Sequence, residues 1–230
     1  MTYNLSDDLI NQIEFILGSK NILKNRVFSI KNHFDNLIID FLDEFSNDIL
    51  KTNKKFNLSD IAALGFWCRK KNFVKFSNQY KKINKKGVGM VFHITPSNIP
   101  TNFAYSLFIS LINENSNIVK ISSQEFTQTN LISQSLKKIL LKKKYSKLKQ
   151  MITIIKYQNN DLITKKISEL SIRRIIWGGD HTVNKIKLIK SNPKCIDIVF
   201  PDRFSMSIIN SNVLCNLSNY QFNNLIKNFY

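Results

Sequence analysis

The side chains best able to bind a ligand gather in three short polar turns, and each turn follows an apolar segment. In chain order they are TPSNIP at residues 95–100, Lys120 with Ser122 and Ser123, and Gly178 with Gly179. Turns at the carboxyl ends of buried strands are where sheets of alternating strands and helices hold their ligands. Glycines in such a turn let backbone amides approach a pyrophosphate at the N-terminus of the next helix.

The first turn belongs to a segment, residues 87–126, that predicts a strand, a turn, a helix and a second strand. Residues 88–94 are nearly all apolar, as in a strand buried on both faces of a parallel sheet. Two prolines end this strand, and from Thr101 the apolar residues recur at helical spacing. Residues 117–121 then read as a strand again, which completes a βαβ unit.

The same alternation continues to the end of the chain. The pattern predicts helices near residues 131–140, 162–170 and 183–189, and strands at 151–155, 172–177, 196–200 and 204–209. Residues 9–17, 35–50 and 60–73 read as helices, and the lysine-rich residues 81–86 as a linker into the sheet. The predicted fold class is therefore α/β, a Rossmann-like, mostly parallel doubly wound sheet preceded by a helical segment.

The charge of the chain is strongly basic. Its 230 residues carry a formal net charge of +18, which would suit nucleic acid, an anionic membrane or an acidic partner. The lysines are dispersed along the chain, with dense clusters only at residues 81–86 and 137–149. A solvated basic surface is the first interpretation, and binding of coenzyme A or of an acidic carrier protein is the alternative.

The cysteines and the hydropathy indicate the compartment. Cys68, Cys195 and Cys215 lack metal-ligand or redox spacing, which predicts a reducing compartment, no disulfide framework and no metal site. The sequence has no run of about 18 apolar residues and no basic leader before an apolar stretch. We therefore expect no membrane span, no signal peptide and a cytoplasmic location.

Five segments resemble the acyl-CoA reductase family typified by the LuxC fatty-acid reductase of bacterial luminescence, a branch of the aldehyde dehydrogenase superfamily. In the order of the family they are DIAALGFWCRK, FHITPSNIPTNFAYSL, NSNIVKISS, IIWGGDHTV and FPDRFS. The resemblance spans residues 35–229 and covers only the amino-terminal part of the family.

The resemblance implies a site for NAD(P) and a role for Asn98. Members of the superfamily bind NAD(P) on a Rossmann-like sheet without the G-x-G-x-x-G fingerprint, which this sequence also lacks. The asparagine of the matching turn donates its amide to the oxyanion that forms when a thiolate attacks the carbonyl. Thr95, Pro96 and Ser97 would meet the phosphate and ribose on the nicotinamide side. From the pattern alone, capping of the following helix explains Asn98.

The second turn bears on the choice of cofactor. The lysine that matches Lys120 reaches the adenosine ribose in the superfamily, and Ser123 stands where an acidic residue often bonds the ribose hydroxyls. Without that carboxylate a 2′-phosphate is not repelled, and Lys120, Ser122 and Ser123 could all donate to it. We therefore expect NADPH. The alternative is an exposed lysine at a strand end in a lysine-rich protein.

The roles of several residues at and after the third turn stay open. Gly178 and Gly179 are expected to bind the cofactor, but Asp180 stands where the superfamily prefers a hydroxyl. A carboxylate there would repel phosphate, and a helix N-cap is the other explanation. His181 is a candidate acid or base without an identified partner. Asp202 is the acidic residue closest to the position that matches the catalytic glutamate of the superfamily. We assign it no catalytic role.

In the family, the nucleophilic cysteine comes after the part that matches residues 210–229. None of the three cysteines of this sequence lies in a segment that matches the surroundings of the nucleophile. We expect two regions, a helical segment at residues 1–84 and an NADP(H)-binding domain at residues 85–230, without the domain that carries the catalytic cysteine. A truncated reading frame, one piece of a split enzyme completed by a second chain, and a pseudoenzyme stay open as explanations.

The resemblance as a whole implies an oxidoreductase. Such an enzyme reduces a fatty acyl thioester, from acyl-CoA or an acyl-protein, to a fatty aldehyde with NADPH through an acyl-cysteine intermediate. This chain would be its nucleotide-binding half, inactive alone. The alternative function is a basic α/β binding module for nucleic acid or an acidic carrier protein, although no recognised nucleic-acid motif supports it.

Overall fold

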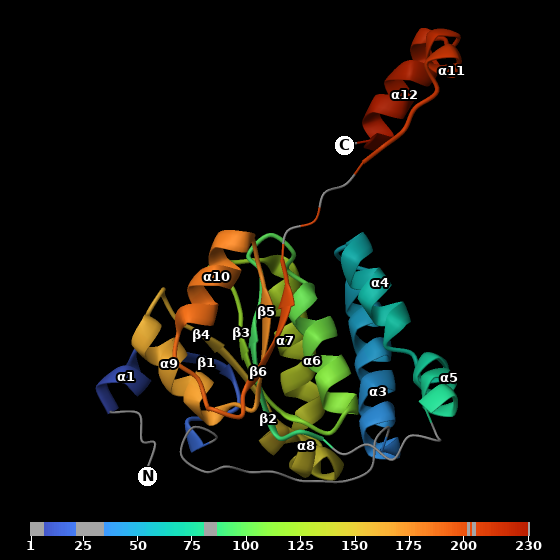
Figure 1. Ribbon diagram of the computed structural model, residues 1–230. Coiled ribbons are helices and arrows are strands. Elements are labelled where there is room, and N and C mark those ends of the chain that lie inside the picture. The colour runs from blue at the N-terminus through green and yellow to red at the C-terminus, as the bar shows by residue number, and fades with distance from the viewer. Residues whose placement is uncertain (1–6, 22–34, 81–86, 202, 204–205, 230) are drawn as a thin grey trace.

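The computed structural model describes residues 7–21, 35–80, 87–201, 203 and 206–229. Figure 1 shows a central sheet with helices on both faces and a pair of C-terminal helices that stand apart from it. The strands are β1 (Glu14–Leu17), β2 (Met90–Ile94), β3 (Ser116–Lys120), β4 (Ile152–Lys156), β5 (Arg173–Trp177) and β6 (Ile196–Phe200). The longer helices are α3 (Asn36–Asn53), α4 (Ser59–Trp67), α5 (Lys70–Tyr80), α6 (Asn102–Ile112), α7 (Thr127–Leu140), α9 (Asp161–Leu170), α10 (Asp180–Leu188) and α12 (Asn219–Phe229). The shorter ones are α1 (Asp7–Asn11), η1 (Lys143–Tyr145), α8 (Ser146–Met151) and α11 (Ser211–Cys215).

The sheet confirms the predicted fold class. Its strand order is β1-β4-β3-β2-β5-β6, and all neighbours are parallel except β1, which runs antiparallel to β4. The order reverses direction at β2, because the chain goes from β2 to β3 on one side and returns later to β5 on the other. In doubly wound sheets a ligand binds at the carboxyl end of the strands at such a reversal.

Each face of the sheet has its own core. One core joins α3, α4, α6 and α7 to side chains of β3 and β4, such as Val119 and Ile152. The other joins α1, α9 and α10 to side chains such as Phe92 and Ile176. Figure 1 shows α6 and α7 against the sheet, with α3 and α4 beyond them. The segment before residue 81 therefore contributes to a core that it shares with the sheet.

The prediction of a helix at residues 9–17 was wrong in its second half. Helix α1 ends at Asn11, and residues 14–17 form β1, which pairs with β4. Phe15 and Leu17 pack into the cores on opposite faces, because the register of β1 against β4 shifts between these two residues and breaks the regular alternation of a strand. Gly18 ends β1 with φ of 83°, and a Cβ there would lie 2.5 Å from Thr153 Oγ1. The expected region of residues 1–84 is thus not purely helical, since β1 extends the sheet.

Two further sequence predictions need correction. The helix expected at residues 60–73 is interrupted at Cys68, where α4 ends and a turn leads into α5. The strand expected at residues 204–209 does not form in its described part, residues 206–209. The linker expected at residues 81–86 lies outside the described residues.

The described part of the chain contains no helix that is both long enough and apolar enough to cross a membrane.

Candidate functional site

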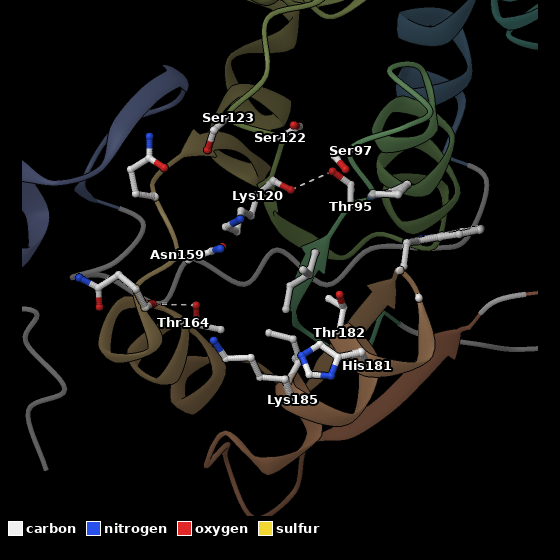
Figure 2. Close-up of a pocket in the computed structure, with 18 of the residues that line it drawn as sticks. Thr95, Ser97, Lys120, Ser122, Ser123, Asn159, Thr164, His181, Thr182 and Lys185 are labelled. Atoms are coloured by element: carbon white, nitrogen blue, oxygen red, sulfur yellow. Dashed lines mark hydrogen bonds between the residues drawn. The ribbon is translucent and has the colours of Figure 1, made fainter.

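A cavity of about 780 Å³ opens at the carboxyl ends of β2, β3, β4 and β5. These four strands are consecutive neighbours and parallel, so the polar turns that follow them meet at one edge of the sheet. The lining consists of residues 94–98 after β2, Lys120 with Ser122 and Ser123 after β3, residues 158–161 after β4, and residues 177–179 with the first turns of α10. Figure 2 shows these side chains around the cavity.

All of the predicted site residues line this one cavity. They are Thr95, Pro96, Ser97, Asn98, Lys120, Ser122, Ser123, Gly178 and Gly179. The structure thus brings together three turns that lie up to 84 positions apart in the sequence, from 95 to 179. His181 also lines the cavity, whereas Asp202 lies outside the described residues.

The turn after β2 is fixed to the neighbouring strand and leaves Asn98 available. Thr95 donates two hydrogen bonds to the carbonyl oxygen of Lys120, from its backbone N at 3.2 Å and from its Oγ1 at 2.9 Å. Asn98 is exposed, and its side chain has no hydrogen-bond partner among the described residues. The N-cap residue of α6 is Thr101, so Asn98 does not cap this helix. Its amide is therefore free to donate to a ligand.

Lys120 is a cation at the wall of the cavity without an acidic partner among the described residues. Its Nζ lies 4.9 Å from the centre of the Tyr157 ring, within the range of a cation–π contact. Burial lowers the pKa of Lys120 from its usual value, because desolvation disfavours the charged form. A partly desolvated amine of this kind gains free energy when an anion approaches it. Tyr157 in turn is held by a 3.0 Å hydrogen bond between its hydroxyl and Thr164 Oγ1.

The turn after β5 places the start of a helix at the cavity. Gly179 is the N-cap residue of α10, and Asp180 is the first residue inside the helix, so Asp180 is not the N-cap. The unpaired amides of a first helical turn attract anionic groups. His181, Thr182 and Lys185 also line the cavity from this helix, and Figure 2 shows them on the side opposite Ser122 and Ser123.

Part of the lining was not predicted from the sequence. The loop after β4 contributes Gln158, Asn159, Asn160 and Asp161, and Thr164 follows from α9. The signal was available, because this polar stretch follows a buried strand as the other three turns do. Lys185 had no comparable signal, since only the packing of α10 places it at the cavity.

The cysteines do not take part in this site. Cys68 is buried in the helical core, and burial raises the pKa of its thiol. Cys195 is half-buried before β6, and Cys215 is exposed on α11. None of the three lines the cavity. The described residues also contain no group of three or more His, Cys, Asp or Glu side chains that could hold a metal ion.

The basic cluster at residues 137–149 is partly neutralised by acidic residues of α3. Lys138 pairs with Asp48, while Lys142 and Lys144 pair with Glu44. This pairing joins α3 to α7 and to the residues that follow it, at the exposed surface.

Family comparison identifies the lineage of the chain. Residues 38–226 match the model of the acyl-CoA reductase (LuxC) family. The chain belongs to this family. A comparison with curated proteins gives no match.

Solved structures similar to this chain include members of the aldehyde dehydrogenase superfamily. A protein from Burkholderia cenocepacia described as an aldehyde dehydrogenase has a TM-score of 0.53 at 12% identity, with 71% of this chain and 37% of that chain covered. PnpE from Pseudomonas sp. WBC-3 has a TM-score of 0.50 at 15% identity, with the same coverage of 71% and 37%. Proline utilization A (PutA) from Bradyrhizobium japonicum has a TM-score of 0.50 at 14% identity, with 71% of this chain and 19% of that chain covered.

These likenesses show the fold. The aligned part spans 37% of the first two proteins and 19% of the third, so this chain matches a minor portion of each.

Proposed function

We propose that the cavity binds NADPH and that the chain is the nucleotide-binding part of an enzyme that reduces a fatty acyl thioester to an aldehyde. The observation that carries this proposal is the meeting of three turns, one of which contains Lys120, at one cavity in a chain of the acyl-CoA reductase family. In our proposal residues 85–230 supply the cofactor site, while β1 adds a strand to the sheet and α3 and α4 contribute to the core on one of its faces.

The donors at the cavity fit a phosphorylated dinucleotide. A volume of about 780 Å³ is within the range of cofactor clefts. The first turn of α10 would receive the pyrophosphate, since the Asp180 carboxylate of this turn does not line the cavity. Lys120, Ser122 and Ser123 would receive the 2′-phosphate. When bound, NADPH would supply the hydride that reduces the acyl carbon.

Asn98 would act on the substrate. Its free amide, next to the end of β2, would donate to the acyl oxygen as this oxygen gains negative charge in the transition state. Thioester reduction through an acyl-enzyme also needs a thiolate, and no cysteine lines the cavity. We propose that this nucleophile comes from a segment other than the described residues or from a second chain, and that the described part is inactive without it. The free cysteines suit a reducing compartment, and we place the activity in the cytoplasm.

A titration of the purified chain with NADPH tests the proposal, with NADH in parallel. We expect saturable binding of NADPH that weakens about tenfold in Lys120→Ala, because one charge-assisted contact is lost. Lys149→Ala is the matched control, since Lys149 is an exposed lysine of α8 that does not line the cavity. Absence of nucleotide binding by folded protein, together with salt-sensitive binding to nucleic acid, would favour the basic-module alternative instead.

A further inference from the structure

Asp161 and Lys185 face each other at one end of the cavity. Lys185 Nζ lies 3.4 Å from Asp161 Oδ1, and both residues line the cavity. Asp161 begins α9 and Lys185 lies in the last turn of α10, so the pair bridges the two helices on this side of the sheet. Their side chains are 60% and 52% exposed, respectively. An ion pair this exposed contributes little to stability and can be exchanged for another partner at low cost.

The surroundings of this pair resemble a site for a ribose that carries a phosphate. Figure 2 shows the amino groups of Lys120 and Lys185 on opposite sides of the same space, with Asn159 and Thr164 between them. Asp161 is the only acidic residue among the residues that line the cavity. A carboxylate accepts hydrogen bonds from the hydroxyls of an unmodified ribose, whereas a cation is needed to bind a 2′-phosphate.

Each member of the pair therefore suits one of the two nicotinamide dinucleotides. With a 2′-phosphate held at Lys120, Lys185 can leave Asp161 and reach the phosphate from the opposite side of the cavity, where it forms a charge-assisted contact. With a free 2′-hydroxyl present, Asp161 can accept its hydrogen bond while Lys185 stays paired. The serine at position 123 leaves this cavity without a carboxylate after β3, so Asp161 would take over that function from the neighbouring loop.

We propose that the Asp161–Lys185 pair determines the cofactor preference of this site, with Lys185 selecting NADPH and Asp161 permitting NADH. This inference rests on the proposed nucleotide-binding function and adds two specificity-determining residues to it. It also predicts that substitution of Lys185 and substitution of Asp161 shift the preference between NADPH and NADH in opposite directions. Loss of a purely structural ion pair would not have opposite effects of this kind.

The test compares dissociation constants for NADPH and NADH in the full chain and its variants. Lys185→Gln is expected to weaken NADPH binding about tenfold, the usual loss for one charge-assisted contact, and to change NADH binding less than about twofold. Asp161→Asn is expected to strengthen NADPH binding about threefold and to weaken NADH binding by a similar factor, because repulsion of phosphate and the ribose contact are both removed. If the two effects add, the double variant should bind each dinucleotide about threefold more weakly and keep nearly the wild-type preference between them.

Lys187→Gln is the matched control. Lys187 lies in the same last turn of α10 and is exposed, but it does not line the cavity. Its loss removes the same favourable charge at the helix end and should leave both affinities unchanged. If Lys185→Gln weakened the binding of NADPH and NADH equally, or changed neither affinity, the inference would be overturned and the proposed function would stay intact. A wild-type chain that binds neither dinucleotide would overturn both.

Discussion

His93 Nε2 lies 3.0 Å from Asn117 Oδ1 at the buried centre of the sheet, between β2 and β3. The amide nitrogen of Asn117 donates to the carbonyl of Asn115, so its Oδ1 accepts and His93 Nε2 must carry the proton. His93 Nδ1 then accepts from Ser106 Oγ at 2.8 Å, and Ser106 Oγ accepts from Trp177 Nε1 at 3.4 Å. A single directional chain of hydrogen bonds therefore connects the core to Trp177 at the cavity.

The buried His93 is expected to make the protein less stable at acidic pH. Burial lowers the pKa of His93 from 6.5 to about 4, because the charged imidazolium would lose its hydration. Above pH 6.5 neither state is protonated and the stability is complete. As the pH falls from 6.5 to 4, the unfolded state gains a proton that the folded state excludes, and the free energy of unfolding should drop by about 3 kcal/mol. Urea unfolding at several pH values between 6.5 and 4 measures this change in the free energy of unfolding.

His93→Gln separates this effect from that of the carboxylates. Glutamine can replace both hydrogen bonds but does not titrate, so its unfolding free energy should vary less with pH than that of the wild type. Parallel pH profiles of the two proteins would show that His93 is not the group responsible.

Tryptophan fluorescence should report ligand binding at the cavity. The chain has two tryptophans, and only Trp177 lines the cavity, where its ring stacks on Phe200 at a centroid distance of 3.8 Å. Trp67 packs instead against Phe73 and Tyr105. Reduced nicotinamide accepts excitation energy from indole, so NADPH should quench the emission. We expect Trp177→Phe to lose the larger part of this quenching and Trp67→Phe to retain it. The reverse result would place the nucleotide elsewhere.

The local sequence was sufficient for the βαβ units and for three of the four turns. The apolar run before Thr95 and the helical spacing after Thr101 are both short-range patterns. Parallel pairing of β2 with β3 and β5 then brings the turns of Asn98, Lys120 and Gly178 to one edge, which follows from topology. The family match adds the expectation that this edge binds a nucleotide.

The remaining features depend on contacts between distant residues. β1 forms because Glu14 and its neighbours pair with β4, more than 130 positions later, and this pairing overrides a helical spacing of Ile13 and Ile16. Lys185 reaches the cavity only through the packing of α10, and its contact with Asp161 spans two helices. Periodicity within a short window carries no information about such pairs.

Tyr157 is expected to position Lys120 for its ligand. The contact of 4.9 Å between Nζ and the ring centre is a cation–π interaction worth about 0.5–2 kcal/mol. Tyr157→Leu should therefore weaken NADPH binding about two- to thirtyfold, while Tyr157→Phe, which keeps the ring, should bind nearly as well as the wild type. In a Lys120→Ala background the leucine substitution should have no further effect. If Tyr157→Leu reduced the affinity for NADPH equally in the wild type and in Lys120→Ala, Tyr157 would support only the fold.

Arg174 is expected to hold the far edge of the sheet and α10 together. It is 2% exposed, and its Nε and Nη2 each donate to the Asp197 carboxylate at 2.7 Å, which joins β5 to β6. Its Nη1 donates to the carbonyls of Ile186 and Ile189 at the end of α10. Arg174→Met removes the donors to the Asp197 carboxylate and to the Ile189 carbonyl, whereas the Ile186 carbonyl keeps its hydrogen bond from Ile189 N, and the substitution should lower the free energy of unfolding by about 3–5 kcal/mol.

Two further variants separate the geometry of Arg174 from its charge. Arg174→Lys keeps the charge but cannot make the two-pronged contact with Asp197 and reach both helix carbonyls, so it should recover only part of the loss. Arg174→Met/Asp197→Asn removes the uncompensated carboxylate and should be more stable than Arg174→Met alone. Thermal or urea unfolding measures all three. Full recovery in Arg174→Lys would mean that charge alone stabilises this edge, and the bidentate geometry would then carry no free energy of its own.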